Sequence, residues 1–284
     1  MGLSQSATIP TPPSMEDLAI YKEKLKNASL NKPFDLRSRL GLKFGHVFDR
    51  DYKFNHNNFC MLNEREFSLR DQMPPVVDQG NLGSCTANAN CNALRFCEMK
   101  EGISSPMRSR LFVYYYERLL EGTVNDDSGA EIRDGIKVLA RNGTPAEALW
   151  PYNIDKFTEE PSSEAQANGL KHKAMQYEVV EQSLDALKIA IGSGFPVLFG
   201  MAVYSSMETP EVTKTGIVPY PLEKDEYLGG HALILTGWSD TKRMFEFQNS
   251  WGTEWGDSGF GFISYDYALN SDYTSDFWRI TLAN

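Results

Sequence analysis

The spacing of hydrophobic residues changes near residue 175. Before that point, three segments carry apolar residues at helical intervals, and they span residues 85–102, 109–120 and 129–143. After it, short β-branched and aromatic runs are separated by Gly, Pro and Asp, which is typical of strands. The pattern therefore predicts an α+β fold of two lobes, mostly helical in the first half and mostly strand in the second.

The strand runs are short, and the N-terminal part of the chain has a weaker pattern. The strands are expected in AMQYEVV, FPVLFGMAVY, HALILTGWS, RMFEFQNSW, GDSGFGFISYDY and FWRITLAN. Residues 1–15 are rich in Ser, Thr and Pro, whereas residues 16–27 have helical spacing. Residues 33–66 contain many Phe, Arg, Asn and His residues and show no clear period.

Charge and hydropathy exclude several classes of protein. The 284 residues carry a net charge of −10, whereas proteins that bind nucleic acids usually present a basic surface. No apolar run reaches the roughly 18 residues that span a membrane. Residues 1–22 also lack the cationic start and apolar stretch of a signal peptide. We therefore expect no nucleic-acid partner and no membrane partner.

The four cysteines are Cys60, Cys85, Cys91 and Cys97. The last three are six residues apart, so neighbours on a helix would face different sides and could not easily bridge. We interpret Cys91 and Cys97 as small buried apolar side chains. No Cys/His cluster has the spacing of metal ligands, so we expect no metal. No organic cofactor is expected either.

Cys85 differs from the other cysteines because it begins a predicted helix. The unpaired N–H groups and partial positive charge of a helix N-terminus favour the thiolate, which is the nucleophilic form. Gly83 and Ser84 allow a tight turn, so the sulfur would face a cleft. An enzyme that transfers acyl groups through such a thiolate also needs a base, a group that orients the base, and donors for the oxyanion.

One of the four histidines is well placed to be the base. His231 follows two glycines and opens the apolar run ALILTGW, at the entry of a predicted buried strand. The others lie in irregular or polar segments, and they are His46, His56 and His172.

The remaining members of a catalytic set lie near the predicted ends of elements. Asn249 closes the strand that follows His231, so two neighbouring antiparallel strands would bring their side chains together. Asn249 would then hold the imidazole tautomer, and Trp251 would shield the pair from water. The Gln79 amide and the Cys85 backbone N–H would supply two donors for the oxyanion.

These motifs resemble those of the papain-type, or cathepsin-like, cysteine peptidases. The segments that carry the resemblance are Gln79-Gly80, Gly83-Ser84-Cys85, His231-Ala232, Asn249-Ser250-Trp251-Gly252, WGTEWGDSGF from Trp251, Phe67-Ser-Leu-Arg-Asp71 and Trp150-Pro151-Tyr152. The resemblance covers about residues 65–284. It implies a papain-like fold, with a helical lobe over about 75–175, an antiparallel β-barrel-like lobe over about 176–284, and the active-site cleft between them.

The resemblance also implies an activity and a set of roles. It implies a cysteine-type endopeptidase that hydrolyses protein or peptide substrates. Cys85 would attack the carbonyl carbon, His231 would take and return the proton, Asn249 would orient His231, and Gln79 would stabilise the oxyanion. The residues expected to bind substrate are Gly83, Ser84, Gly129, Ala130, Gly230, Trp251, Ser275 and Asp276. An acid at Asp276 would favour a basic substrate side chain.

Two positions depart from the usual family pattern. Leu82 occupies a position where the family has a cysteine, and residues 127–130, where its partner would lie, contain none. Both halves of that disulfide are missing together, which fits the disulfide-poor microbial or viral branch and an intracellular or virion-associated location. Thr86 follows the nucleophile, where the family has Trp or Tyr.

Residues 1–64 precede the part that resembles a mature enzyme. In the family such a segment is a propeptide, so we expect an intramolecular inhibitor and a proenzyme. Two other functions stay open from the sequence. The chain would be a catalytically inactive papain-fold scaffold or binding protein, or a thiol acyltransferase that transfers acyl groups to amines.

Overall fold

A single mixed sheet forms the second half of the molecule. The computed structural model describes residues 35–59, 63–103 and 105–284, and in these residues eight strands pair in the order β2-β8-β3-β5-β6-β7-β4, with β1 also paired to β5. All pairs are antiparallel except β4–β7. The strands are β1 (Glu66–Ser68), β2 (Ala174–Val179), β3 (Val197–Tyr204), β4 (Ile217–Val218), β5 (Tyr227–Ser239), β6 (Met244–Gln248), β7 (Phe260–Ser264) and β8 (Thr274–Ala283).

The strand β5 lies at the centre of this sheet. It pairs with β3, β6 and β1, and its residues 230–238 are buried. This explains the nearly continuous apolar run that follows His231, because a strand covered on both faces has no polar side to alternate with. In the register of β3 with β5, Met201 lies opposite His231.

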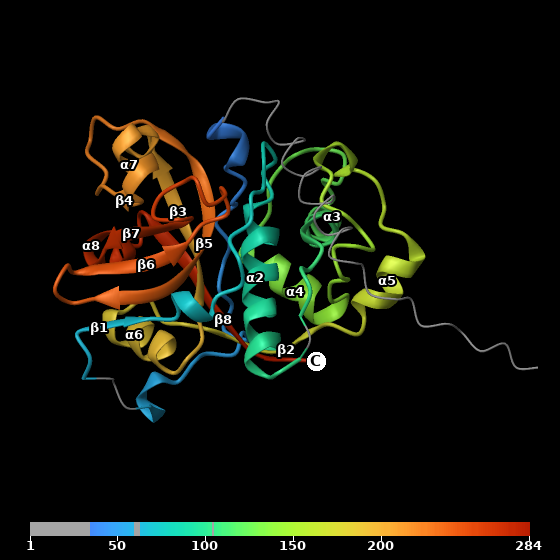
Figure 1. Cartoon of the computed structure of the whole chain (residues 1–284), viewed down its shortest axis with the longest axis horizontal. Coiled ribbons are helices and arrows are strands. Elements are labelled where there is room, and N and C mark those ends of the chain that lie inside the picture. The colour runs from blue at the N-terminus through green and yellow to red at the C-terminus, as the bar shows by residue number, and fades with distance from the viewer. Residues whose placement is uncertain (1–34, 60–62, 104) are drawn as a thin grey trace, which may run out of the picture. The chain divides into compact units, whose positions relative to one another are not determined.

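The helices of the described unit, residues 35–284, divide between the two sides of the molecule. The α-helices are α2 (Cys85–Lys100), α3 (Arg110–Glu121), α4 (Ile132–Arg141), α5 (Ser163–Gly169), α6 (Leu184–Gly192), α7 (Pro210–Thr215) and α8 (Tyr265–Leu269). Short 3-10 helices are η1 (Arg37–Arg39), η2 (His56–Asn58), η3 (Arg70–Gln72), η4 (Ile154–Lys156) and η5 (Ser205–Glu208). In Figure 1 most of the strands lie on the left together with α6, α7 and α8, whereas α3, α4 and α5 lie on the right and α2 lies between them.

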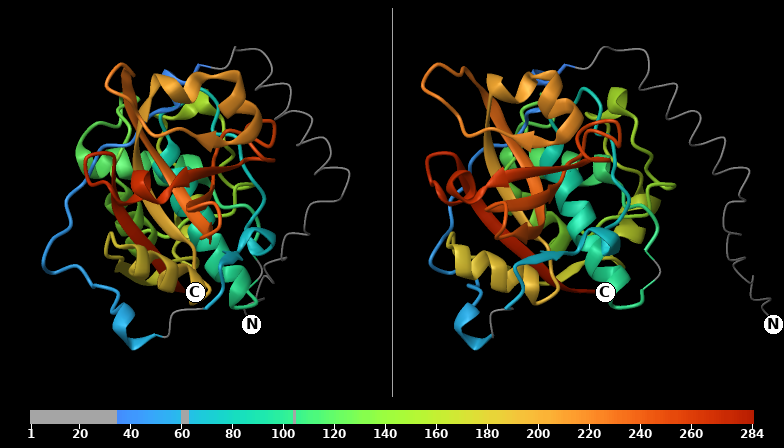
Figure 2. Two further views of the ribbon diagram at one scale, coloured as in Figure 1. Left: turned by 90° about the vertical axis from the view of Figure 1, so that its left-hand side faces the viewer. Right: turned by 60° about the vertical axis from the view of Figure 1, so that its left-hand side comes forward.

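The helix α2 joins the two lobes. It packs against α3 and α4 on one side and against β5 and β8 on the other. Its side chains are therefore buried on nearly every face, including polar ones such as Asn88, Asn90 and Asn92. Figure 2, in which the strand lobe faces the viewer, shows α6 and α7 at opposite ends of the sheet, with α2 behind it.

Buried polar groups hold the segment that leads into α2. Arg110 forms an ion pair with Glu147 (3.1 Å) and donates a hydrogen bond to the carbonyl of Asp78 (3.0 Å). The Tyr152 hydroxyl donates to the carbonyl of Gln79 (2.8 Å), whose backbone N–H donates to Ser250 (2.9 Å). These bonds connect the helical lobe to the segment after β6, so Gln79 has a fixed position at the junction of the lobes.

Most of the predicted elements are confirmed. The three helices expected over 85–102, 109–120 and 129–143 are α2, α3 and α4. Each of the six expected strand runs contains a strand. The short helices α5, α6 and α7 were not predicted, and the end of the fifth run is the helix α8 instead of a strand. The expected helix over residues 16–27 lies outside the described residues.

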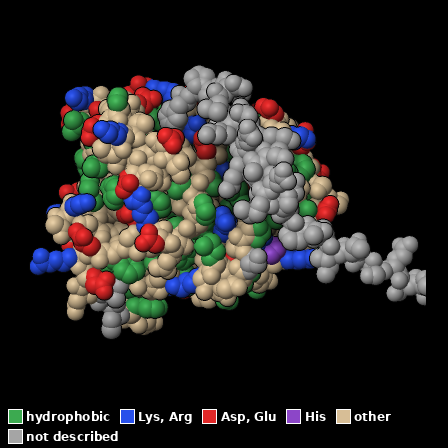
Figure 3. Space-filling view, viewed as in Figure 1, with side chains coloured by type: hydrophobic (Ala, Val, Ile, Leu, Met, Phe, Trp, Pro, Cys, Tyr) green, Lys and Arg blue, Asp and Glu red, His purple; other side chains and the backbone are tan. Residues whose placement is uncertain are grey.

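Neither the surface charge nor the lengths of the helices favour one function over another. On the face shown in Figure 3, acidic and basic side chains are interspersed. In the part of the chain that the structure describes, no helix has the length and apolar character needed to cross a membrane.

Candidate active site

Cys85 is the first residue of α2, and its side chain is fully buried. The backbone N–H groups of Ala232 and Gly41 hydrogen bond to its thiol. Burial raises the pKa of the Cys85 thiol to about 11, although these two hydrogen bonds and one from Thr86 oppose the increase. Cys85 is therefore a neutral thiol near pH 7 in this structure.

His231 and Asn249 lie together, as the sequence predicts for two neighbouring strands. The His231 Nε2 atom is 2.8 Å from the Asn249 Oδ1 atom. The backbone N–H of Ser250 donates to the same oxygen (2.8 Å), which identifies it as the acceptor and makes His231 Nε2 the protonated nitrogen. Among the described residues, His231 Nδ1 has no hydrogen-bond partner, so this nitrogen is left to exchange a proton.

The His231 ring is shielded from water. Trp251 stacks on it with 4.6 Å between the ring centroids. Burial lowers the pKa of His231 to about 4, the Asn249 hydrogen bond opposes this, and the positive charge of Arg39 lowers it further. In this structure the cysteine and the histidine are therefore both neutral.

Gln79 directs its amide nitrogen toward the N-terminal part of the chain. Its Nε2 atom donates to the carbonyl of Arg39 (3.0 Å) and to that of Leu82 (2.9 Å). Its Oε1 atom accepts from the Ser250 hydroxyl (2.7 Å), so the orientation of the amide is set by its partners. A carbonyl oxygen from residues 35–59 thus occupies the position next to the expected oxyanion donor.

We call residues 35–59 the strap. In Figure 1 the strap (blue) runs between the strand lobe and α2. The Leu42 N–H donates to the carbonyl of Gly230 (3.0 Å), and the Lys43 N–H donates to that of Ala130 (2.9 Å). The Ala130 N–H donates back to the carbonyl of Gly41 (2.8 Å). The strap therefore hydrogen bonds to both lobes through two of the residues expected to bind substrate, Gly230 and Ala130.

The strap residue that lies against Cys85 is Gly41, which has no side chain. A β-carbon at Gly41 would overlap the carbonyl oxygen of Gly83, and one at Gly129 would overlap the carbonyl oxygen of Gly41. Gly129 also has a φ of +69°, which glycine adopts at little cost. Backbone alone fits between Gly83 and Gly129.

Asp276, on β8, contacts the strap at Gly45. Its carboxylate accepts the Gly45 N–H (2.9 Å) and the Ser275 hydroxyl (3.3 Å). Burial raises the pKa of Asp276, although those two hydrogen bonds and the charge of His46 oppose the increase. A β-carbon at Gly45 would also lie 3.4 Å from Asp276 and would approach the Glu131 carboxylate more closely. Two acids thus face the same part of the strap.

Other residues expected at the site have different surroundings. The Ser84 hydroxyl is within hydrogen-bond distance of the Tyr152 hydroxyl and accepts from Asn88 inside the helical lobe, so it does not face the strap. The Gly83 N–H donates to the carboxylate of Asp127 (3.0 Å). Cys91 and Cys97 are buried free thiols, as expected.

One residue differs from its expected surroundings, and several strap residues were not identified from the sequence. The sequence places His172 in a polar segment, but its Nδ1 atom lies 2.9 Å from Arg108 and 3.4 Å from Glu98, which form a buried ion pair. Arg39 and Gly41 lie at the centre of the site, yet their segment has no period or motif that distinguishes them.

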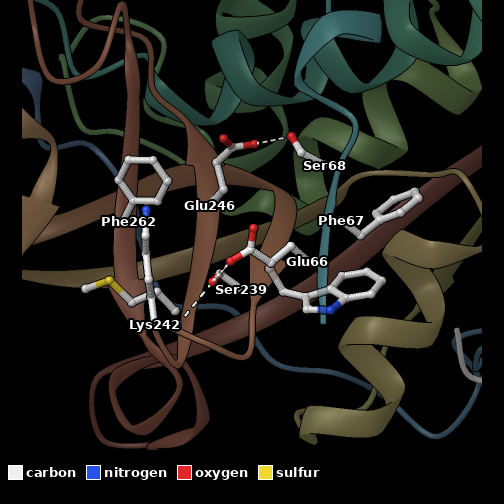
Figure 4. Close-up of a pocket in the computed structure, with 9 residues that line it drawn as sticks. Glu66, Phe67, Ser68, Ser239, Lys242, Glu246 and Phe262 are labelled. Carbon is white, nitrogen blue, oxygen red and sulfur yellow. Dashed lines mark hydrogen bonds between the residues drawn. The ribbon is translucent and has the colours of Figure 1, made fainter. Parts of the chain in front are cut away.

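The structure also contains a pocket on the strand lobe, away from these residues. Figure 4 shows it among β1, β5, β6 and β7. Its carboxylates are already hydrogen bonded, Glu66 to Ser239 and Glu246 to Ser68. Among the described residues, no cluster of three or more His, Cys, Asp or Glu side chains could hold a metal ion.

Comparison with protein families identifies the class of protein. The model of the papain family cysteine proteases matches residues 63–276. The chain is 39% identical over 213 residues to an uncharacterized peptidase C1-like protein of Acanthamoeba polyphaga mimivirus, which covers 72% of this chain and 68% of that protein. It is 27% identical over 208 residues to a cathepsin B-like protein of Giardia intestinalis, covering 68% and 67%. The chain therefore belongs to the papain family and is a cysteine-type peptidase.

Solved structures show the same fold. Xylellain, a cysteine protease from Xylella fastidiosa, superimposes with a TM-score of 0.78 at 32% identity, covering 89% of this chain and 100% of that chain. A procathepsin B from Trypanosoma congolense superimposes with a TM-score of 0.69 at 13% identity, covering 94% and 98%. The papain-like α+β fold expected from the sequence is confirmed.

The neutral state of Cys85 gives a pH dependence that can be measured on the intact chain. Because only the thiolate absorbs strongly in the near ultraviolet, the absorbance that Cys85 contributes reports its ionisation without a reagent that must reach the buried sulfur. We expect the thiolate absorbance of the parent minus that of Cys85→Ser to be absent at pH 7 and to appear only as the pH approaches the raised pKa of about 11. Thiolate absorbance from Cys85 already present at pH 7 would contradict the neutral state.

Proposed function

We propose that this chain is a papain-type endopeptidase made as a proenzyme, with Cys85, His231, Asn249 and Gln79 as its catalytic residues and the strap as its inhibitor. The observation that carries the proposal is the position of the strap backbone. The Gln79 amide binds the Arg39 carbonyl oxygen, and the Gly41 N–H binds the Cys85 thiol. The strap thus occupies the place where a substrate backbone would meet the nucleophile.

The proposed reaction uses each residue once the strap has left. The Cys85 thiolate attacks the substrate carbonyl carbon, and the oxygen that gains negative charge accepts hydrogen bonds from Gln79 Nε2 and the Cys85 N–H. Protonated His231 gives its Nδ1 proton to the leaving amine. It then takes a proton from the water that hydrolyses the thioester. Asn249 holds the ring through Nε2, so the same nitrogen exchanges protons in both steps.

The orientation of the strap explains why it would not be cleaved. At the sulfur the strap presents an N–H group, from Gly41, where a substrate would present a carbonyl carbon. Leu42 and Ala130 form a parallel bridge. A backbone bound in this orientation fills the site and blocks it without being positioned for attack.

Contacts on both sides of Cys85 support the role of the strap as an inhibitor. On one side, Arg39 pairs with Asp78 (2.8 Å). On the other side, Asp51 pairs with Arg133 (2.6 Å). The Phe54 N–H donates to the Val179 carbonyl (2.8 Å), and the Val179 N–H donates to the Tyr52 carbonyl (2.8 Å). Burial alone would raise the pKa of Asp51, but bonds from Arg133 and the Phe48 N–H keep it below its usual value. The carboxylate of Asp51 is therefore ionised when it binds Arg133.

Acids near Gly45 support a preference for basic substrates. Asp276 and Glu131 both face this part of the strap, and each loses a neighbour when the strap leaves. A buried carboxylate without a partner is costly, so a substrate Arg or Lys that pairs with Asp276 would gain affinity. Ala130 and Gly230 would hydrogen bond to the substrate backbone, as they do to the strap, and Gly129 would let that backbone approach closely.

The catalytic assignments can be tested in a cut form. The intact chain would be folded, cut at a protease site introduced at residues 60–62, and separated from its N-terminal fragment. We expect Cys85→Ala to abolish hydrolysis of a fluorogenic peptide and Gln79→Ala to reduce kcat by about 100- to 1000-fold, because one oxyanion donor is lost. Circular dichroism would check the fold. If Gln79→Ala keeps kcat within about threefold of the parent, Gln79 is not an oxyanion donor.

The role of the strap can be tested with one substitution in the intact chain. Gly41→Val places a side chain against the Gly83 carbonyl, and overpacking of this kind displaces the strap, so peptide hydrolysis should rise about tenfold or more. Val47→Ala, at an exposed strap residue, is the matched control and should leave the intact chain inactive. An intact Gly41→Val chain as inactive as the parent, beside an active cut form, would rule out inhibition by the strap.

The preference for basic substrates can be tested with paired peptides. At each of the three positions before the scissile bond, Arg would be compared with citrulline, which has a similar shape and no charge. We expect kcat/KM of the cut form to favour Arg by about tenfold at one position, as charge-assisted hydrogen bonds do, and Asp276→Asn to remove the preference. Asn also tolerates the left-handed backbone of this position, where φ is +58°. Glu223→Gln, at an exposed acid, should keep the preference, and an unchanged ratio in Asp276→Asn would refute the assignment.

A further inference from the structure

Thr86, the residue after the nucleophile, hydrogen bonds to a buried acid. Its hydroxyl donates to Glu117 Oε2 (2.8 Å), and both side chains are fully buried. Thr86 lies in the first turn of α2 and Glu117 lies in α3. The bond therefore connects the turn that carries Cys85 to the neighbouring helix at the place where the resemblance leads one to expect an aromatic residue.

The surroundings of Glu117 favour its neutral form. Burial raises the pKa of Glu117 well above its usual value. The Thr86 bond opposes the increase, the charges of Glu121 and Asp134 add to it, and the charge of Arg118 opposes it. Its second oxygen, Oε1, has no hydrogen-bond partner among the described residues. A carboxylate left this way would be costly, whereas a protonated acid carries no charge and still accepts from Thr86 through Oε2.

The space around Oε1 is shared with another polar side chain. Asn90 Oδ1, on α2, is also without a hydrogen-bond partner in the residues that the structure describes. A β-carbon at Gly135, on α4, would overlap both Glu117 Oε1 and Asn90 Nδ2. Glycine at 135 thus leaves room for these two side chains where three helices meet.

A charge on Glu117 would act against the nucleophile. An ionised Glu117 would raise the pKa of Cys85. A neutral Glu117 removes this repulsion and keeps the hydrogen bond, so the turn stays in place while the thiolate forms. The same turn carries the Cys85 backbone N–H, which is one of the two proposed oxyanion donors.

We infer that Glu117 is a positioning residue that works in its protonated form. Through Thr86 it holds the first turn of α2, and with it the Cys85 N–H, in the geometry that binds the oxyanion. The inference rests on the proposed roles of Cys85 and its N–H. Glu117 itself contacts no substrate.

Five variants of the cut form separate this role from simple packing. They are Glu117→Gln, Glu117→Leu, Thr86→Ser, Thr86→Val and the double variant Thr86→Val/Glu117→Leu. Loss of the hydrogen bond in the Leu and Val variants should lower kcat about tenfold, as one net hydrogen bond would, with KM within about twofold. Gln and Ser keep the acceptor and the donor, so they should recover most of the turnover. The double variant should be no slower than either single variant.

Two results would overturn the inference. If Gln lowers kcat as much as Leu, Glu117 acts as an anion. If the effects of Val and Leu multiply in the double variant, the two residues do not act through one bond.

Infrared spectroscopy of the intact chain tests the protonation of Glu117 without an activity assay. The protonated-carboxyl band should be present in the parent and lost in Glu117→Gln, and its absence from the parent would also overturn the inference. A cut form of the parent without turnover would instead count against the proposed function, because the infrared result would stand independently.

Discussion

The packing of the N-terminal end of α2 against β5 is the contact on which the site depends. It places Cys85, from the helical lobe, within hydrogen-bond distance of the Ala232 N–H, next to His231 in the strand lobe. Both elements are held on several sides, because α2 is buried between the lobes and β5 is the central strand of the sheet. The two hydrogen bonds between Gln79 and Ser250 tie the proposed oxyanion donor to the segment that carries Asn249.

The same junction explains why one extended segment could control the enzyme. A backbone that lies between the lobes meets Gly230 on one side and Ala130 on the other. It also excludes water from Cys85 and His231, and burial then favours the neutral form of each. A strap in this position would act in two ways, by filling the substrate site and by suppressing the thiolate–imidazolium pair. Its departure would restore solvent and reverse both effects.

The sequence carries more signal for the four proposed catalytic residues than for their surroundings. Cys85 begins α2 and Asn249 directly follows β6, whereas His231 lies inside β5 and Gln79 lies in the segment that leads to α2. The structure brings His231 to Asn249 and leaves Gln79 and Cys85 against the strap. The helix α6 was missed because LDALKIAIG has almost no polar face, so its spacing does not separate a helix from a strand.

Contacts between distant segments could not be predicted. The strap has no helical or strand period, so its partners depend on tertiary packing alone. Gly41 faces Gly83 and Asp51 faces Arg133 across separations that carry no local signal. Thr86 is similar: the sequence marks it as unusual, but only the fold reveals Glu117 as its partner.

Labelling of Cys85 with a peptidyl epoxide that alkylates papain-type cysteines tests the central claim most directly. It would be applied to the intact chain and to the cut form, each beside its Cys85→Ala variant. We expect label on Cys85 in the cut form only, because the strap covers the thiol in the intact chain. Equal labelling of both forms would contradict inhibition by the strap. No labelling of either would contradict the assignment of Cys85 as the nucleophile.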